Sequence, residues 1–216
     1  MHSLTTVGVI WSMLSFIVAI LCSSGFYLPY WLEGEIMNVT VHLGVFRRCN
    51  YLARKSFTTT YYVREECGRY KRFNDIPSTA WQGSTIMLGI ACGILVLISL
   101  ISLLAICVQD IITKHTARVC GCFQTLAAIC LVASCVIFPF GWDCVEVRQA
   151  CGENAKKYEL GNCTVGWAAF LVAVGTVATL VCSCLSVKAG KSDRMKASDY
   201  DARYDTMPLR ANGNHL

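Results

Sequence analysis

The chain has 216 residues, of which 55% are hydrophobic and only 15% are charged. Soluble domains carry about 25% charged residues, so this composition argues against a soluble globular enzyme and for a protein held largely in lipid. The net charge of +5 is spread over several segments, and it does not form the basic patch that nucleic-acid-binding proteins carry.

Four stretches contain no charged residue, and each is long enough to cross a membrane as a helix. A spanning helix needs about 20 apolar residues, and in lipid its backbone groups must bond within the segment. The predicted transmembrane segments are residues 7–28, 83–108, 119–140 and 165–187. The first run lacks a basic flank and exceeds the about 7–15 residues of a signal-peptide core, so we interpret it as a retained helix rather than a cleaved signal.

Four spans place both termini on one side of the membrane. The N-terminus (1–6), a short loop (109–118) and a tail (188–216) then share that side, and a long loop (29–82) and a medium loop (141–164) lie on the other. The positive-inside rule does not settle the sides, because the two larger loops hold 11 lysine and arginine residues against 8 in the short loop and tail. The tail is polar, and we expect it to be disordered.

The cysteines decide the orientation. The two larger loops contain five of them and the tail contains none, and loop cysteines that can pair belong on the oxidising side of a membrane. Two N-glycosylation sequons begin at Asn38 and Asn162, in the same two loops. We therefore expect both loops to be extracellular and both termini to be cytosolic, in a multi-pass protein of the plasma membrane.

The simplest pairing joins cysteines within each loop, Cys49 to Cys67 and Cys151 to Cys163. Each disulfide would contribute roughly 3 kcal/mol in the chain-entropy model. Cys144 is then left over, and it can be a buried thiol, a site of intermolecular pairing or a competitor for Cys151. The buried thiol is the simplest of these interpretations.

The long loop has the pattern of a folded β unit rather than of a linker. In Asn38–Phe46, apolar residues alternate with polar or small ones, which predicts a half-buried strand. The β-branched and aromatic segment Phe57–Val63 predicts a second strand, with Ala53–Ser56 as an exposed turn between the two. Cys49 and Cys67 are then expected just past the two strands, where a disulfide could tie them together.

Six short motifs, taken in order, resemble the lipoma HMGIC fusion partner-like (LHFPL) tetraspan family and within it the founding branch. They are Pro29-Tyr30-Trp31, Gly44-Val45-Phe46-Arg47-Arg48-Cys49, Glu65-Glu66-Cys67-Gly68-Arg69-Tyr70, Pro139-Phe140-Gly141-Trp142-Asp143, Glu146-Val147-Arg148-Gln149-Ala150-Cys151-Gly152 and Leu160-Gly161-Asn162-Cys163. The resemblance covers residues 4 to about 190. The arrangement of the first three motifs is also similar to the wider claudin-like superfamily.

This resemblance implies a claudin-like tetraspan fold, in which a left-handed, all-α four-helix membrane bundle carries a small extracellular β-sheet built from both loops. It also implies that both loop disulfides are structural. The residues that it assigns to the family motif are Trp31, Gly44, Phe46, Gly141, Trp142 and Asp143. Some members of the family are auxiliary subunits of the mechanotransduction channel complex of hair cells or of inhibitory GABA-A receptors. The resemblance gives no settled partner for the founding branch.

Two further patterns concern helix packing and the membrane interface. Tryptophans near the predicted helix ends are interpreted as interface anchors, with a partner contact as the alternative. For Trp31 a further alternative is packing of the loop onto the bundle. The tryptophans are Trp31, Trp81, Trp142 and Trp167. Gly89 and Gly93 form a small-residue motif in the second span that allows close helix approach. Packing within the bundle is the favoured interpretation, and dimerisation or docking on a partner helix is the alternative.

The sequence contains no pattern that predicts catalysis, a cofactor or a metal site. The four histidines fall in four different segments, and the predicted spans hold none of the charged groups that a pump or carrier needs. We expect a non-enzymatic membrane protein that contacts lipid, binds no nucleic acid and acts as an auxiliary subunit or scaffold for a channel, receptor or adhesion complex. The alternative is a claudin-like cell–cell contact or barrier protein, and a homo-oligomer is compatible with both.

Overall fold

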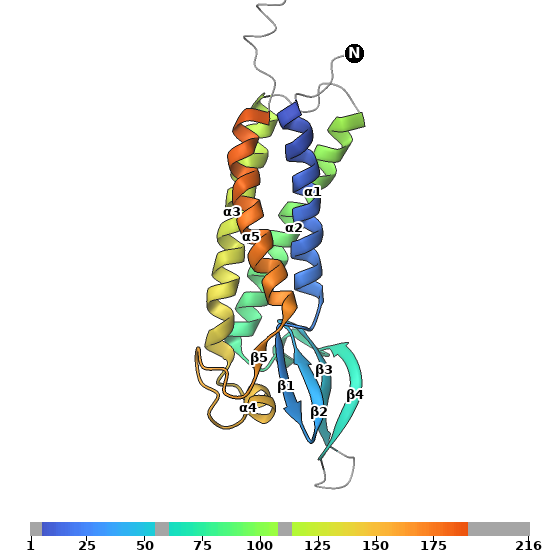
Figure 1. The fold of residues 1–216 in the computed structure, drawn as a ribbon, viewed down its shortest axis with the longest axis vertical. Coiled ribbons are helices and arrows are strands. Elements are labelled where there is room, and N and C mark those ends of the chain that lie inside the picture. Colours follow the sequence, from blue (N-terminus) through green and yellow to red (C-terminus); the bar gives the residue numbers. More distant parts are fainter. Residues whose placement is uncertain (1–5, 55–60, 108–113, 190–216) are drawn as a thin grey trace, which may run out of the picture.

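In the computed structural model, four long helices stand side by side and a small β-sheet lies at one end of them (Figure 1). The structure describes residues 6–54, 61–107 and 114–189. Part of the expected Ala53–Ser56 turn and almost the whole of the expected tail lie outside these residues.

The long helices are α1 (Thr6–Tyr27), α2 (Thr79–Cys107), α3 (Lys114–Ile137) and α5 (Trp167–Ala189). Each has at least 22 residues, which at about 1.5 Å per residue exceeds a hydrocarbon core of roughly 30 Å. All four are long and apolar enough to cross a membrane. Because α1 and α3 each pack against both α2 and α5, the helices close into the expected four-helix bundle.

Close approach within the bundle occurs between α1 and α5, and it depends on glycines. A Cβ atom on Gly25 of α1 would lie 2.5 Å from Val172 Cγ2 and 3.0 Å from the Ala168 carbonyl oxygen of α5. A Cβ atom on Gly175 of α5 would lie 2.5 Å from the Cys22 sulfur of α1. Small residues of this kind let two transmembrane backbones meet.

Buried polar groups inside the bundle bond to one another across the helices. The Trp11 indole donates to Gln124 Oε1 at 3.1 Å, and Gln124 Nε2 donates to the Ser15 hydroxyl at 2.9 Å. The hydroxyls of Ser84 and Ser134 lie 2.7 Å apart between α2 and α3. An unpaired polar group in hydrocarbon is costly, so these bonds favour one rotation of each helix. Gln124, the most polar group of the spans, therefore has a structural partner on α1.

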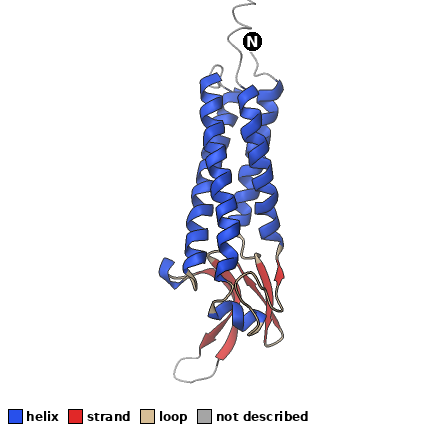
Figure 2. Ribbon diagram, turned by 90° about the vertical axis from the view of Figure 1, so that its left-hand side faces the viewer, coloured by secondary structure: helices blue, strands red, loops and turns tan. Residues whose placement is uncertain are grey.

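The sheet contains five antiparallel strands in the order β4-β3-β2-β1-β5 (Figures 1 and 2). The long loop supplies β1 (Leu32–Ile36), β2 (Val39–Leu43), β3 (Arg47–Arg54) and β4 (Tyr61–Arg69). The medium loop supplies β5 (Thr164–Val165), which pairs with β1, and the short helix α4 (Val145–Cys151), which packs against β1. The sheet is thus built from both loops, as the resemblance implied.

The strand predictions for the long loop were incomplete. The predicted strand Asn38–Phe46 contains β2, and its apolar face is buried as expected, with Val41 and Leu43 1% and 3% exposed. However, β1 and β3 were missed. The last three residues of Phe57–Val63 belong to β4, and residues 57–60 lie outside the part of the chain that the structure describes. The sequence of β1 does alternate, with Glu33 and Glu35 between apolar or small residues, but the strand is only five residues long. The arginine-containing β3 lacks the alternation of a half-buried strand, and pairing with neighbouring strands determines its conformation.

Candidate functional site at the sheet end of the bundle

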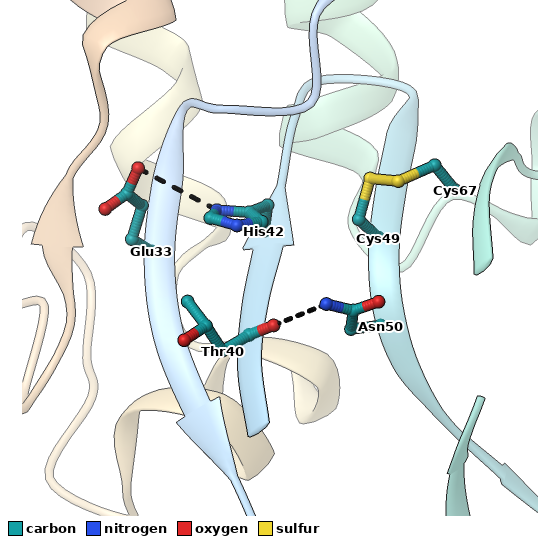
Figure 3. A network of polar contacts seen from close by, with 6 residues as sticks. All are labelled: Glu33, Thr40, His42, Cys49, Asn50 and Cys67. Atoms are coloured by element: carbon teal, nitrogen blue, oxygen red, sulfur yellow. Dashed lines mark hydrogen bonds and ion pairs between the residues drawn. A yellow bond between two sulfur atoms is a disulfide. The ribbon is translucent and has the colours of Figure 1, made fainter. Parts of the chain in front are cut away.

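Both predicted disulfides are formed. Cys49 and Cys67 lie directly opposite each other on β3 and β4, with their Cα atoms 4.0 Å apart (Figure 3). They lie within the paired strands, not past the strand ends as the sequence suggested. Cys49 belongs to β3, which was not predicted, and β4 extends to Arg69, beyond the predicted end at Val63. Cys151 bonds to Cys163 and so ties the end of α4 to the residue before β5.

At Asn50, a residue in the left-handed backbone conformation, a side-chain hydrogen bond joins β3 to β2, where the two strands share few backbone pairs. Only two residue pairs join β2 to β3, and the pairing of β3 with β4 is interrupted at Asn50, where φ is 56°. Figure 3 shows the Asn50 amide reaching the Thr40 carbonyl oxygen, to which it donates at 2.7 Å. An asparagine tolerates this left-handed conformation and supplies the bond that the ladder lacks.

Three of the four predicted interface tryptophans are instead buried. Trp31 donates to the Gly25 carbonyl oxygen at 2.7 Å, and its ring lies 4.9 Å from that of Phe138. Trp81 stacks on the same Phe138 ring and donates to its carbonyl oxygen at 3.1 Å. The exposed fractions of Trp31, Trp81 and Trp142 are 2%, 0% and 9%. The anchor interpretation was wrong for these three, and for Trp31 the packing alternative is correct.

Trp167 is the fourth predicted interface tryptophan and differs from the other three. Its exposed fraction is 48%, and its ring stacks on that of Tyr30 with centroids 5.3 Å apart. Its place at the start of α5 leaves the anchor interpretation open for this residue.

The glycines of the family motif lie where a side chain would collide. A Cβ atom on Gly44 would lie 2.8 Å from the Pro29 Cα atom, and one on Gly141 would lie 2.5 Å from Trp81 Cδ1. The neighbouring Phe46 ring packs on the Phe26 ring of α1 with centroids 4.7 Å apart. Gly44 and Phe46 therefore hold the sheet on α1, whereas Gly141 lets the segment after α3 pack closely on the start of α2.

Asp143 is the motif residue without such a role. Its carboxylate lies 3.9 Å from the Lys157 ammonium group, and both side chains are exposed. An exposed ion pair at this distance contributes little stability.

A half-buried ionic cluster joins β3 to α4. Arg48 pairs with one carboxylate oxygen of Glu146, and the Tyr70 hydroxyl donates to the other oxygen at 2.6 Å. The Arg48 guanidinium also lies over the ring of Tyr51, with its central carbon 4.0 Å from the centroid, and over that of Tyr70 at 4.7 Å. Sequence reasoning missed this cluster, because Glu146 lies 98 and 76 residues from its two partners and no local pattern marks it.

Burial controls the protonation of this cluster. It raises the pKa of Glu146 above the ordinary carboxyl value, while the Tyr70 hydrogen bond and the Arg48 charge oppose that rise. Burial and the adjacent Glu146 carboxylate also raise the pKa of Tyr70, so its hydroxyl keeps the proton that it donates. The cluster is thus a structural clasp between the two loops.

Cys144 is a free, buried thiol, which was the simplest of its three interpretations. Burial raises the pKa of the Cys144 thiol to about 11. Because the thiolate is the reactive form, this cysteine is a poor partner for disulfide exchange.

Both sequon asparagines are exposed on the sheet end. Asn38 lies in the turn between β1 and β2, where Met37 and Asn38 have φ angles of 53° and 60°. Asn162 lies beside the second disulfide and donates its backbone N–H to the Cys151 carbonyl oxygen at 2.8 Å. Glycosylation at these residues stays a prediction.

Neither Gly89 nor Gly93 provides close helix packing inside the bundle. A Cβ atom on Gly89 would lie at an ordinary 3.6 Å from the end of the Phe26 ring, and one on Gly93 would have no described atom within 4 Å. The favoured interpretation of this motif therefore fails. The close helix contacts are instead made by Gly25 and Gly175 between α1 and α5, and by Gly121 of α3 against Ser186 of α5. Gly93 is exposed on the outer face of α2.

The described residues contain no group of three histidine, cysteine or acidic side chains that could hold a metal ion. Between α4 and the sheet lies a cavity of only about 40 Å³, beside Arg48 and Glu146. That space suits a water molecule rather than a substrate. What the sheet end presents is a surface held in place by disulfides and the clasp.

A sequence model of the family described as "Lipoma HMGIC fusion partner-like protein" matches residues 7–191. The chain belongs to the LHFPL tetraspan family. The matched residues run from α1 to the end of α5, so the LHFPL family assignment rests on most of the sequence and not on one motif.

Curated LHFPL relatives match over most of their length. LHFPL tetraspan subfamily member 2 protein from Homo sapiens is 30% identical, across 84% of this chain and 86% of its own. Member 3 from Homo sapiens is 31% identical across 91% and 80%, and member 4 from Mus musculus is 31% identical across 88% and 74%. The names of these LHFPL proteins include the word tetraspan. In agreement with that name, this chain has four described helices that are long and apolar enough to cross a membrane.

Proposed function

We propose that this LHFPL protein is a non-enzymatic auxiliary subunit or scaffold that binds a membrane channel, receptor or adhesion protein. In this proposal it lies in the plasma membrane with the sheet end outside the cell and both termini in the cytosol. Two disulfides at the sheet end support that orientation, because disulfides persist on the oxidising side of a membrane. Two exposed sequon asparagines at the same end agree with it.

The observation that carries the proposal is the free edge of β4. This strand pairs with β3 on one side, and no described strand pairs with its other edge (Figure 1). An open edge strand offers a row of backbone donors and acceptors to another chain. Tyr61 and Tyr62 on β4 are 53% and 44% exposed, and exposed tyrosines are common in protein–protein contacts.

The clasp and the first disulfide support the β4 edge as a binding surface. Cys67 ties β4 to β3, and Arg48 on β3 is bonded through Glu146 to α4. A surface that is already ordered loses less conformational entropy on binding. We infer that β4 is held ready for a partner rather than ordered by it.

Gly93 provides a second contact within the membrane. It exposes backbone on the outer face of α2, where no described atom lies within 4 Å of a built Cβ. A partner helix can approach closely at such a position. We propose docking of a transmembrane helix there, alongside docking of an extracellular segment on β4.

Co-purification from membranes, normalised to surface protein, tests this proposal with matched variants. The β4 variant carries Tyr61→Ser and Tyr62→Ser, and its control is Phe73→Ser, an equally exposed aromatic residue outside the sheet. The membrane variant is Gly93→Leu, and its control is the exposed Ala173→Leu on α5. We expect both test variants to reach the surface with less partner than their controls.

The outcomes separate the two surfaces. Loss of partner only with the β4 variant would assign docking to the sheet, and loss only with Gly93→Leu would assign it to α2. Recovery equal to the controls with both variants would contradict both assignments.

A second candidate function is claudin-like assembly at cell–cell contacts. The same free edge of β4 favours it, because a second copy of the chain can pair there as readily as a different partner. Co-culture of expressing and non-expressing cells distinguishes the two functions. Contact assembly predicts enrichment at borders between two expressing cells, whereas an auxiliary subunit alone predicts an even surface distribution.

A further inference from the structure

Two shallow apolar grooves lie at the end of the bundle away from the sheet. One, of about 400 Å³, runs between α2 and α3 and is lined by Leu97, Ile98 and Ile101 from α2 and by residues of α3. The other, of about 410 Å³, lies on α3 beside Cys122 and Leu126. Both volumes fall within the range of about 300–1,000 Å³ that is typical of small-molecule sites.

One ridge on α3 separates the two grooves. His115, Val119 and Phe123 line both of them, and residues spaced by four lie above one another on one helix face. The ridge is exposed, with Val119 and Phe123 39% and 49% exposed. Both grooves therefore begin at the first turn of α3 and extend along that helix, one as far as Phe123 and the other as far as Leu126.

The outer end of this double groove is basic and the rest is apolar. Arg118 lines the second groove, His115 lines both, and both side chains are exposed. No ion-pair partner of Arg118 occurs among the residues that the structure describes. Most of the other side chains that line the two grooves are aliphatic or aromatic.

We propose that the double groove binds one phospholipid with an anionic headgroup. Its two acyl chains occupy the two grooves on either side of the Val119–Phe123 ridge, and its phosphate lies against Arg118 and His115. A soluble phosphate would leave both apolar grooves uncovered, so the occupant is a lipid of the membrane. Basic pockets between transmembrane helices recognise anionic headgroups in this way. Under the proposed orientation this end faces the cytosolic leaflet, where anionic lipids concentrate.

Headgroup preference distinguishes this site from ordinary lipid contact. The full-length protein, purified in detergent, is incubated with phosphatidylserine or phosphatidylcholine of identical acyl chains, and native mass spectrometry measures the bound fraction. We expect a single tightly held lipid and a preference for phosphatidylserine of about fivefold or more, the factor that corresponds to one basic side chain near a headgroup. Equal retention of the two lipids would overturn the proposal.

A charge variant tests the headgroup contact. Arg118→Gln should abolish most of the preference for phosphatidylserine while leaving some retention of both lipids. Its control is Arg148→Gln, which removes the same charge from the exposed surface of α4 at the opposite end of the molecule. Equal effects of the two variants would mean that net charge, and not this site, sets the preference.

A steric variant tests the grooves. Val119→Trp places a large ring on the exposed ridge and should lower retention of both lipids, whereas Val132→Trp, exposed at 47% on α3 outside both grooves, should not. Thermal unfolding and gel filtration establish that each variant is folded. If Val119→Trp does not fold, Leu126→Trp fills the second groove alone and should also lower retention. Unchanged retention in a folded groove variant would contradict the assignment.

Discussion

Gly25 and Gly93 lie on adjacent spanning helices, yet their surroundings differ. The α5 backbone and Val172 fill the space beside Gly25, whereas the space beside Gly93 is open. The spacing of glycines on one helix does not reveal this difference, because the contact depends on the neighbouring helix. The sequence pattern therefore selected Gly89 and Gly93, while the structure places close helix contacts at Gly25, Gly121 and Gly175.

Alanine substitutions at Gly25 and Gly93 should have different effects on stability. Gly25→Ala should lower stability by about 1–3 kcal/mol, because its methyl group would meet Val172 and the α5 backbone. Gly93→Ala should be neutral or slightly stabilising, because alanine is the better helix former and the site is open. Thermal unfolding in one detergent measures both, and equal unfolding midpoints would contradict this account of the α1–α5 contact.

The clasp predicts a pH dependence with a defined sign. The pKa of Glu146 is raised in the folded state, so in the window above the ordinary carboxyl pKa of about 4.3 the folded protein binds more protons than the unfolded chain. Stability relative to Glu146→Gln should therefore fall as the pH rises through that window. Unfolding midpoints of the two proteins between pH 4 and 7 measure this, and a constant difference would contradict it.

Removing the Tyr70 hydroxyl tests the other side of the clasp. Tyr70→Phe should cost about 1.5–3 kcal/mol, because it removes a hydrogen bond to the half-buried Glu146 carboxylate. It should also extend to higher pH the range over which Glu146 makes stability fall, because the hydrogen bond that is lost lowers the pKa of Glu146. Tyr62→Phe, at an exposed position on β4, is the control and should unfold like the wild type.

At the scale of elements, the helices were predictable and the strands only in part. Spanning helices follow from the absence of charge over some 20 residues, which is a local property. The ends of β1 and β3 depend on neighbouring strands, and β5 comes from the other loop. The disulfides could be predicted from cysteine positions alone, whereas the clasp between Arg48 and Glu146 needed the docking of α4 on the sheet.

The first disulfide is the element that holds β4. Cys67→Ser should lower the stability of the sheet end by about 2–5 kcal/mol and leave Cys49 unpaired. Proteins are marginally stable, so we expect retention in the cell and a reduced surface level. Surface biotinylation and a non-reducing peptide map measure these effects. A normal surface level with an unchanged map would show that this pair is not the one used in cells.

At the scale of the whole molecule, orientation decides what the sheet can meet. The lysine and arginine count and the cysteine distribution disagree, and the structure places both disulfides at one end of the bundle. We expect a tag in the Ala53–Ser56 turn to be accessible to antibody on intact cells and a tag after Leu216 to be accessible only after permeabilisation. Surface staining of the C-terminal tag on intact cells would reverse the orientation.

The proposed function depends on a partner protein, so recovery of that partner is its most direct test. The measurement is quantitative affinity purification of the full chain from native membranes, followed by mass spectrometry, with the Tyr61→Ser/Tyr62→Ser protein as the matched comparison. We predict that a channel, receptor or adhesion protein is recovered in amounts comparable to the chain itself and is reduced in the β4 variant at equal surface level. Recovery of only this chain and lipid, unchanged by the variant, would contradict an auxiliary-subunit function.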